Sequence, residues 1–323
     1  MPLCEQSSYT PPRFLTSGHA QTVWASLTRR VAGVTYRRER IETPDGDFLD
    51  LDWSPVGSPK LVIVSHGFEG NASQAYVQGM VKALHRRGFD VLAWSFRGLS
   101  GEPNRLLRTY HAGDSGDLET VIRHALSQQR YRTLDLVGFS LGGGQILKFI
   151  GERASDVPKI IRRAVTISVP CHLASSAAKF TQMSHRVYMY YFLRRFHRTL
   201  SAKEKIMPDQ LSTSGFWNLK NFHDLDNRYT APIHGFQDAH DYWAKASCKP
   251  FLPDIRIPTL LLNAKDDPFL AAESYPMETA RTNPHLFLET PAYGGHVGFV
   301  AFNDHNEYWS ETRAGEFLQE SDS

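Results

Sequence analysis

The sequence predicts an α/β protein with a mostly parallel sheet, helices on both faces and one helical insertion. Short apolar runs alternate with segments of helical periodicity between residues 61 and 169, and this alternation resumes from residue 258 to 319. Such alternation is typical of a parallel sheet covered by helices. Between Cys171 and Pro253 no buried parallel strand is legible. We therefore expect residues 1–170 and 254–323 to form the core, and residues 171–253 to form an inserted helical lid.

The individual elements follow from apolar runs, turn residues and helical spacing. A stretch rich in β-formers at 34–42, the turn PDGD at 44–47 and the alternating stretch 48–53 together predict a β-hairpin. The remaining strands are expected at 61–65, 90–96, 134–138, 164–169, 258–263 and 285–289. Helices are expected at 73–87, 114–128, 142–151, 271–280 and 304–319.

Composition and charge narrow the class of protein. The 323 residues include 36 Lys and Arg against 34 Asp and Glu, so a formal net charge of +2 argues against a nucleic-acid partner. Cys4, Cys171 and Cys248 are widely separated, which argues against a disulfide framework or a cysteine-built zinc site. The first residues lack the pattern of a secretory signal, and no apolar run approaches the roughly 20 residues of a membrane helix. We expect a cytoplasmic protein.

The pattern G-x-S-x-G at residues 138–142 provides a candidate nucleophile, Ser140. It follows an apolar strand and opens a helix, which is the context that gives this motif its meaning. A sharp strand-to-helix turn would hold the serine in a strained conformation, and flanking glycines avoid Cβ clashes. The turn would also direct the unpaired N–H groups of the helix N-terminus towards the reaction centre.

A base and an acid are available further along the chain. His296 lies in a glycine-flanked loop between the last strand and the last helix. Asp266 and Asp267 follow the strand at 258–263, and the order serine, aspartate, histidine is that expected of α/β hydrolases. We favour Asp267 as the acid because it directly precedes a proline, and we keep Asp266 as the alternative.

Two backbone N–H groups are expected to form an oxyanion hole. One belongs to Leu141, the residue after the nucleophile, and the other to Phe68, in the loop after the strand at 61–65. The flanking residues His66 and Asn71 are expected to border the substrate.

The segment VYMYYFLRRFHR at 187–198 is the most distinctive part of the expected lid. Its aromatic residues could pack on the core, line an acyl pocket or contact a membrane surface through the arginines. Under the acyl-pocket reading, Tyr190, Tyr191 and Phe192 contact the substrate. Arg97 and Glu102, on the loop after the strand at 90–96, are expected to form an ion pair.

Several fragments together resemble a known family. They are GHAQT at 18–22, HGFEGN at 66–71, FRGLSGEPN at 96–104, YHAGD at 110–114, GFSLGG at 138–143, AKDDPF at 264–269 and GGH at 294–296. These fragments resemble the α/β hydrolases, and more narrowly the YheT-like bacterial hydrolases related to animal abhydrolase-domain lipases. The resemblance implies the same charge-relay residues, Ser140, Asp267 and His296. Leu99 stands where that group often has a cysteine.

These observations predict a serine esterase that acts on a small-molecule carboxylic ester and needs neither a cofactor nor a metal. A peptidase or amidase with the same triad is an alternative, and so is a non-catalytic ligand-binding protein on the same fold. We expect neither a nucleic-acid partner nor membrane contact, and the lid is the one part of the chain through which membrane contact stays open as an alternative. The oligomeric state stays open.

Overall fold

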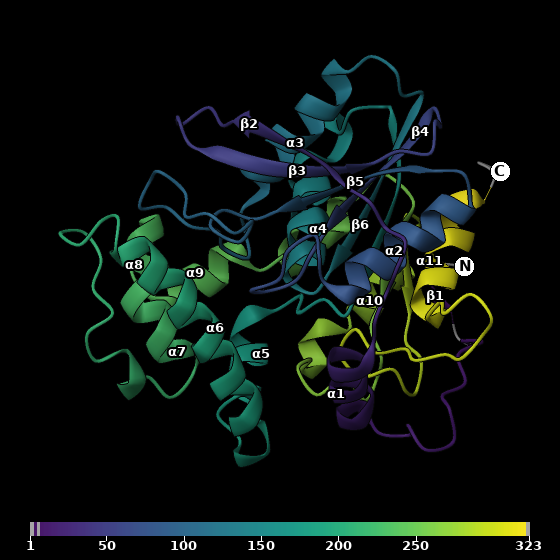
Figure 1. Ribbon diagram of the computed structural model, residues 1–323. Coiled ribbons are helices and arrows are strands. Elements are labelled where there is room, and N and C mark those ends of the chain that lie inside the picture. The colour runs from purple at the N-terminus through teal and green to yellow at the C-terminus, as the bar shows by residue number, and fades with distance from the viewer. Residues whose placement is uncertain (1–2, 5–6, 321–323) are drawn as a thin grey trace.

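The computed structural model describes residues 3–4 and 7–320, which form a sheet of nine strands with helices on both faces (Figure 1). The strands are β1 Leu3–Cys4, β2 Arg37–Glu42, β3 Phe48–Ser54, β4 Lys60–Ser65, β5 Asp90–Ser95, β6 Thr133–Phe139, β7 Ile161–Ile167, β8 Thr259–Leu262 and β9 Leu286–Glu289. Their order is β1-β9-β8-β7-β6-β4-β5-β3-β2. Only the β2–β3 and β3–β5 pairs are antiparallel in the described sheet. The predicted α/β class with a mostly parallel sheet is confirmed.

Two apolar clusters fill the space between the sheet and its helices. On one face, α2 Ala75–Arg86 and α11 Trp309–Gln319 pack on β4, β5 and their neighbours. On the other face lie α3 Ser115–Ser127, α4 Leu141–Arg153 and α10 Met277–Thr282. A further helix, α1 Gly18–Thr28, lies in the chain between β1 and β2, and neither α1 nor β1 has a counterpart among the predicted elements.

The predicted hairpin is present and explains two buried aspartates. Asp50 and Asp52 lie on β3, and both are almost fully buried. Arg40 and Arg38 stand directly opposite on β2, and each donates two hydrogen bonds of 2.8–2.9 Å to its partner carboxylate. Paired in this way, the acidic side chains tolerate burial.

The predicted helix at 271–280 differs from the structure. Residues 272–274 form a short 3-10 turn, and α10 begins only at Met277. Pro276 immediately precedes α10, and a proline inside a helix would remove one backbone hydrogen bond and clash with the preceding turn. The last helix likewise begins at Trp309 rather than near residue 304.

Residues 171–253, all of which the structure describes, contain helices and no strand. The helices are α5 Leu173–Lys179, α6 Arg186–Glu204, α7 Phe222–Leu225, α8 Ala231–His234 and α9 Ala239–Ala246. In the sequence these helices lie between β7 and β8, and in space they lie together to one side of the sheet (Figure 1). Aromatic and aliphatic side chains of this segment form an apolar cluster of their own, which also includes Phe269 of the core.

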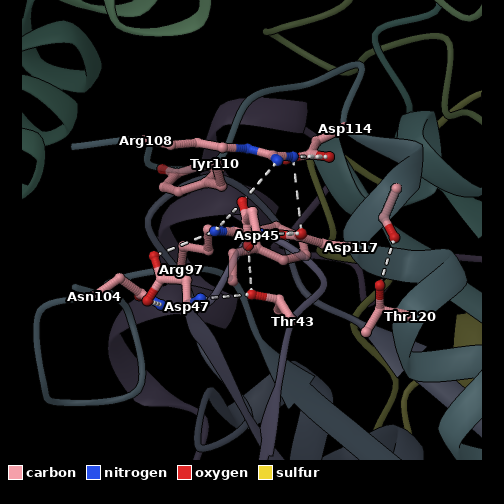
Figure 2. A network of polar contacts seen from close by, with 12 residues as sticks. Thr43, Asp45, Asp47, Arg97, Asn104, Arg108, Tyr110, Asp114, Asp117 and Thr120 are labelled. Atoms are coloured by element: carbon pink, nitrogen blue, oxygen red, sulfur yellow. Dashed lines mark hydrogen bonds and ion pairs between the residues drawn. The ribbon is translucent and has the colours of Figure 1, made fainter. Parts of the chain in front are cut away.

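Arg97 is the centre of a buried polar network (Figure 2). Its guanidinium group donates two hydrogen bonds of 2.7 Å to Asp117 on α3, and it also contacts Asp45 and Asp47 in the hairpin turn. The predicted Arg97–Glu102 ion pair is therefore wrong, because Glu102 pairs with Arg40 instead. The network ties the start of the loop after β5 to the hairpin and to α3.

Candidate active site

Ser140 lies at the turn between β6 and α4, in a strained backbone conformation with φ +50° and ψ −119°. The adjacent glycines are required by close approach. A Cβ atom at Gly142 would lie 2.3 Å from the carbonyl oxygen of His66, and one at Gly143 would lie 2.5 Å from Val169. A Cβ atom at Gly138 would meet the backbone of Gly143 at 2.7 Å. Because these three positions lack a side chain, the β6–α4 turn can lie close to the ends of β4 and β7.

The structure brings Ser140, His296 and Asp267 together. His296 Nε2 lies 3.0 Å from the Ser140 hydroxyl oxygen, and His296 Nδ1 lies 2.9 Å from Asp267 Oδ2. The Asp267 carboxylate is buried, and its Oδ1 accepts a hydrogen bond from the Phe269 N–H. An imidazole held between a hydroxyl and a buried carboxylate can take the hydroxyl proton as a nucleophile attacks.

Asp266 points elsewhere and supports the histidine loop. Its Oδ1 accepts a hydrogen bond of 2.9 Å from the N–H of Gly295, the residue before the histidine. Burial raises the pKa of Asp266. Of the two aspartates considered from the sequence, Asp267 is the one that contacts the imidazole.

Helix α1 also holds the histidine loop, a role that the sequence did not predict. The His296 N–H donates a hydrogen bond of 2.8 Å to the hydroxyl oxygen of Thr22, which in turn donates one of 2.7 Å to the Gly18 carbonyl. A Cβ atom at Gly295, whose φ is +59°, would lie 2.4 Å from the Gly18 carbonyl oxygen. The only sequence signal was the fragment GHAQT at 18–22.

Among three consecutive N–H groups in the loop after β4, one lacks a hydrogen-bond acceptor in the described part of the chain. The Gly67 N–H donates to the Tyr76 hydroxyl and the Glu69 N–H to the Tyr110 hydroxyl. The Phe68 N–H between them has no acceptor among the described residues. Leu141 is the first residue of α4, so its N–H has no acceptor within the helix.

A cavity of about 450 Å³ opens at Ser140 and His296. Most of its walls are apolar and aromatic, and many come from the 171–253 segment. They include Phe68, Leu141, Phe180, Phe192, Phe196, Phe222, Trp243 and Phe269. Of the five residues predicted to contact substrate, Tyr191 and Phe192 line this cavity, whereas His66, Asn71 and Tyr190 do not.

Those three residues have other contacts. His66 is fully buried; its Nε2 accepts the Phe96 N–H, its Nδ1 contacts the Gly67 carbonyl at 2.7 Å, and burial lowers its pKa to about 3. Asn71 Oδ1 accepts hydrogen bonds from the N–H and hydroxyl of Ser73. Tyr190 is 60% exposed and lies near Trp217. None of the three is placed to bind a substrate in the cavity.

Neither a metal-binding cluster nor a membrane-spanning helix is found among the described residues. No group of three or more His, Cys, Asp or Glu side chains within residues 3–4 and 7–320 is placed to hold a metal ion. No helix in the described part of the chain has the length and apolar character needed to span a lipid bilayer.

Fold and site geometry together define an α/β hydrolase. The family model for the alpha/beta hydrolase fold matches residues 60–301, and the chain belongs to this family. Among individual proteins, the chain is similar to YheT of Escherichia coli (strain K12), with 33% identity over 97% of this chain and 93% of the relative.

Other relatives carry names of lipid hydrolases. Human phospholipase ABHD3 is 28% identical over 91% of this chain and 74% of its own length. The monoacylglycerol lipase of Saccharomyces cerevisiae is 27% identical over 85% of this chain and 62% of its own length. Among solved structures, the Pyrococcus furiosus esterase Pf2001 superposes with a TM-score of 0.61 at 20% identity, covering 90% of this chain and 96% of that one. The structural likeness supports the fold, and the sequence relatives place the chain among esterase- and lipase-like hydrolases.

Proposed function

We propose that this protein is a serine hydrolase of carboxylic esters, with Ser140 as nucleophile, His296 as general base and Asp267 as the acid that orients it. The observation that carries the proposal is the continuous chain of hydrogen bonds from the Ser140 hydroxyl through His296 to the buried Asp267 carboxylate. The strained conformation of Ser140 supports it, because such strain gathers at functional sites.

The reaction would proceed through an acyl-enzyme. The Ser140 oxygen attacks the ester carbonyl carbon while His296 Nε2 takes the hydroxyl proton, and Asp267 stabilises the resulting imidazolium. The N–H groups of Phe68 and Leu141 donate to the oxyanion of the tetrahedral intermediate. His296 returns the proton to the leaving alcohol. Water then attacks the acyl carbonyl carbon while His296 takes its proton. The bond from that carbon to the Ser140 oxygen breaks, and His296 returns the proton to Ser140 as the carboxylic acid leaves.

The walls of the cavity favour an ester with an apolar acyl group. Phe192, Phe196 and Phe222 belong to the 171–253 segment, so we propose that this segment is a lid that forms the acyl pocket. Burying one more methylene of an acyl chain adds about 0.8 kcal/mol of binding free energy. A cytoplasmic location stays a prediction, and membrane contact through the lid stays the less favoured alternative.

Ester hydrolysis with a Ser140→Ala control tests the proposal. We expect the wild-type protein to hydrolyse nitrophenyl esters, to prefer acyl groups longer than acetate and to be labelled by a fluorophosphonate. Ser140→Ala should lose turnover and labelling. Faster cleavage of aminoacyl nitroanilides would support the peptidase alternative, and tight ester binding without turnover would support a ligand-binding protein. Equal labelling of wild type and Ser140→Ala would contradict the assignment of the nucleophile.

A further inference from the structure

Side chains of helix α6, in the 171–253 segment, contact the loop that carries Phe68. The Phe68 ring lies nearly parallel to that of Phe196, at 5.8 Å and 12°, and meets the Phe192 ring edge-on at 5.5 Å. The next residue, Glu69, accepts a hydrogen bond from Arg195 at its carbonyl and one of 2.8 Å from the Thr199 hydroxyl at Oε2. Side chains from successive turns of one helix thus hold two consecutive loop residues.

Glu69 has a backbone conformation that needs such support. Its φ is +53°, a left-handed value that is unfavourable for a residue other than glycine. Its N–H donates a hydrogen bond of 3.1 Å to the Tyr110 hydroxyl, and that hydroxyl donates one of 2.8 Å back to Glu69 Oε1. Tyr110 and α6 therefore fix both the main chain and the side chain of Glu69.

The Glu69 carboxyl group is buried, and a buried carboxylate is unfavourable unless hydrogen-bond donors surround it. The residue is only 3% exposed, and burial raises the pKa of its carboxyl. Each carboxylate oxygen has one hydroxyl donor, Tyr110 on the core side and Thr199 on the lid side. A carboxylate shared in this way links the lid to the loop after β4. If either hydroxyl is lost, one buried oxygen loses its donor.

We propose that α6 assembles the oxyanion hole: Thr199, Arg195 and Phe196 hold Glu69 and Phe68 so that the Phe68 N–H faces the reaction centre only when the lid covers it. Glu69, Thr199 and Arg195 are then positioning residues. The inference rests on the proposed function. It also means that an acyl group that fills the cavity raises kcat as well as lowering KM, because it holds the lid that completes the site.

Thr199→Val is the main test, with Thr199→Ser as the matched control that keeps the hydroxyl. We expect Thr199→Val to lower kcat by about tenfold or more, because small misplacements in a catalytic site have large effects on rate. Its KM should stay within about twofold of wild type, since the cavity walls are unchanged. Affinity for an alkyl boronic acid should fall with kcat, because the tetrahedral adduct on Ser140 places an oxygen in the oxyanion hole. Thr199→Ser should behave as wild type in all three measurements.

Arg195→Gln provides the second variant, and thermal melting separates folding from function. Arg195 is only partly buried, so its replacement should leave the melting temperature close to wild type while lowering kcat. If Thr199→Val and Arg195→Gln fold and keep wild-type kcat and boronate affinity, the inference is wrong and the proposed function stands. If Thr199→Val unfolds, the Arg195→Gln measurements alone decide. If Ser140→Ala still turns over ester, the proposed function itself is wrong.

Discussion

The loop that carries His296 and the loop that carries Phe68 are held by different parts of the molecule. Around His296, the supporting groups are Thr22 on α1, Asp266 in the loop after β8, and Ser168, whose hydroxyl accepts the Val297 N–H at 2.9 Å. Around Phe68, the support comes largely from α6 of the inserted segment.

Activation of the nucleophile and stabilisation of the oxyanion, the two tasks proposed for the site, therefore rely on different supporting elements. Core elements supply the hydrogen bonds that hold the loop of His296. The inserted segment contacts the loop of Asp267 only beyond the aspartate, at the carbonyls of Pro268 and Leu270 and at the Phe269 ring. The candidate oxyanion donor Phe68, by contrast, is held directly by α6 of that segment. A change in the position of the insertion would therefore act most directly on Phe68, and would remove one group that stabilises the transition state.

The largest effect is expected within the core, from the two adjacent aspartates. Asp267→Asn should lower kcat by about 10⁴-fold, because an amide at this position favours the wrong imidazole tautomer. Asp266→Asn should lower kcat by no more than about tenfold, since its amide oxygen can still accept the Gly295 N–H. Steady-state ester hydrolysis measures both. Equal losses in the two variants would mean that Asp266 takes part in the proton relay.

Much of this core could be predicted from the sequence because its signals are local. Apolar runs bounded by turns predicted the strands of the parallel sheet other than β1. The position of Asp267 before a proline favoured it over its neighbour as the acid. The role of Glu69 could not be predicted, since its carboxylate is shared between Tyr110 and Thr199, and Thr199 lies 130 positions away. A sequence pattern does not encode such distant contacts.

The direction in which a side chain points was the second feature that the sequence could not predict. The prediction that His66 contacts substrate followed from its place beside the oxyanion loop, but its ring points into the core and binds backbone groups there. Tyr190 and Tyr191 are neighbours on one helix, yet only Tyr191 lines the cavity. Which side of a helix faces a cavity depends on how that helix packs, which its own residues do not determine.

A smaller loss of kcat is expected when the support of the His296 loop by Thr22 is removed, and it can be compared with the loss of Thr199, which supports the Phe68 loop. Thr22→Val removes the acceptor of the His296 N–H, and we expect kcat to fall by about tenfold because a partly buried donor is left unpaired. Thr22→Ser should keep the wild-type rate.

Because Thr22 and Thr199 share no partner, the double variant Thr22→Val/Thr199→Val should show the product of the single effects on kcat, within about twofold. By contrast, Thr199→Val and Arg195→Gln both act on Glu69, so their effects should not multiply. If the Thr22 and Thr199 effects also fail to multiply, the two supports are not independent.

The smallest effect concerns the pH dependence of stability inside the insertion. Asp226 is buried; Thr230 and Trp243 each donate a hydrogen bond to its carboxyl group, and burial raises its pKa from 3.8 to about 6. The folded state therefore binds this proton more tightly than the unfolded chain does. The stability that it contributes is full below the unfolded pKa and is lost as the pH rises through about 6. Asp226→Asn should flatten this part of the melting-temperature profile between about pH 4 and about pH 7, while Asp209→Asn, at an exposed position of the same segment, should not. An unchanged profile in Asp226→Asn would show that the pKa of Asp226 is the same in the folded and the unfolded protein, so that the hydrogen bonds from Thr230 and Trp243 offset the effect of burial.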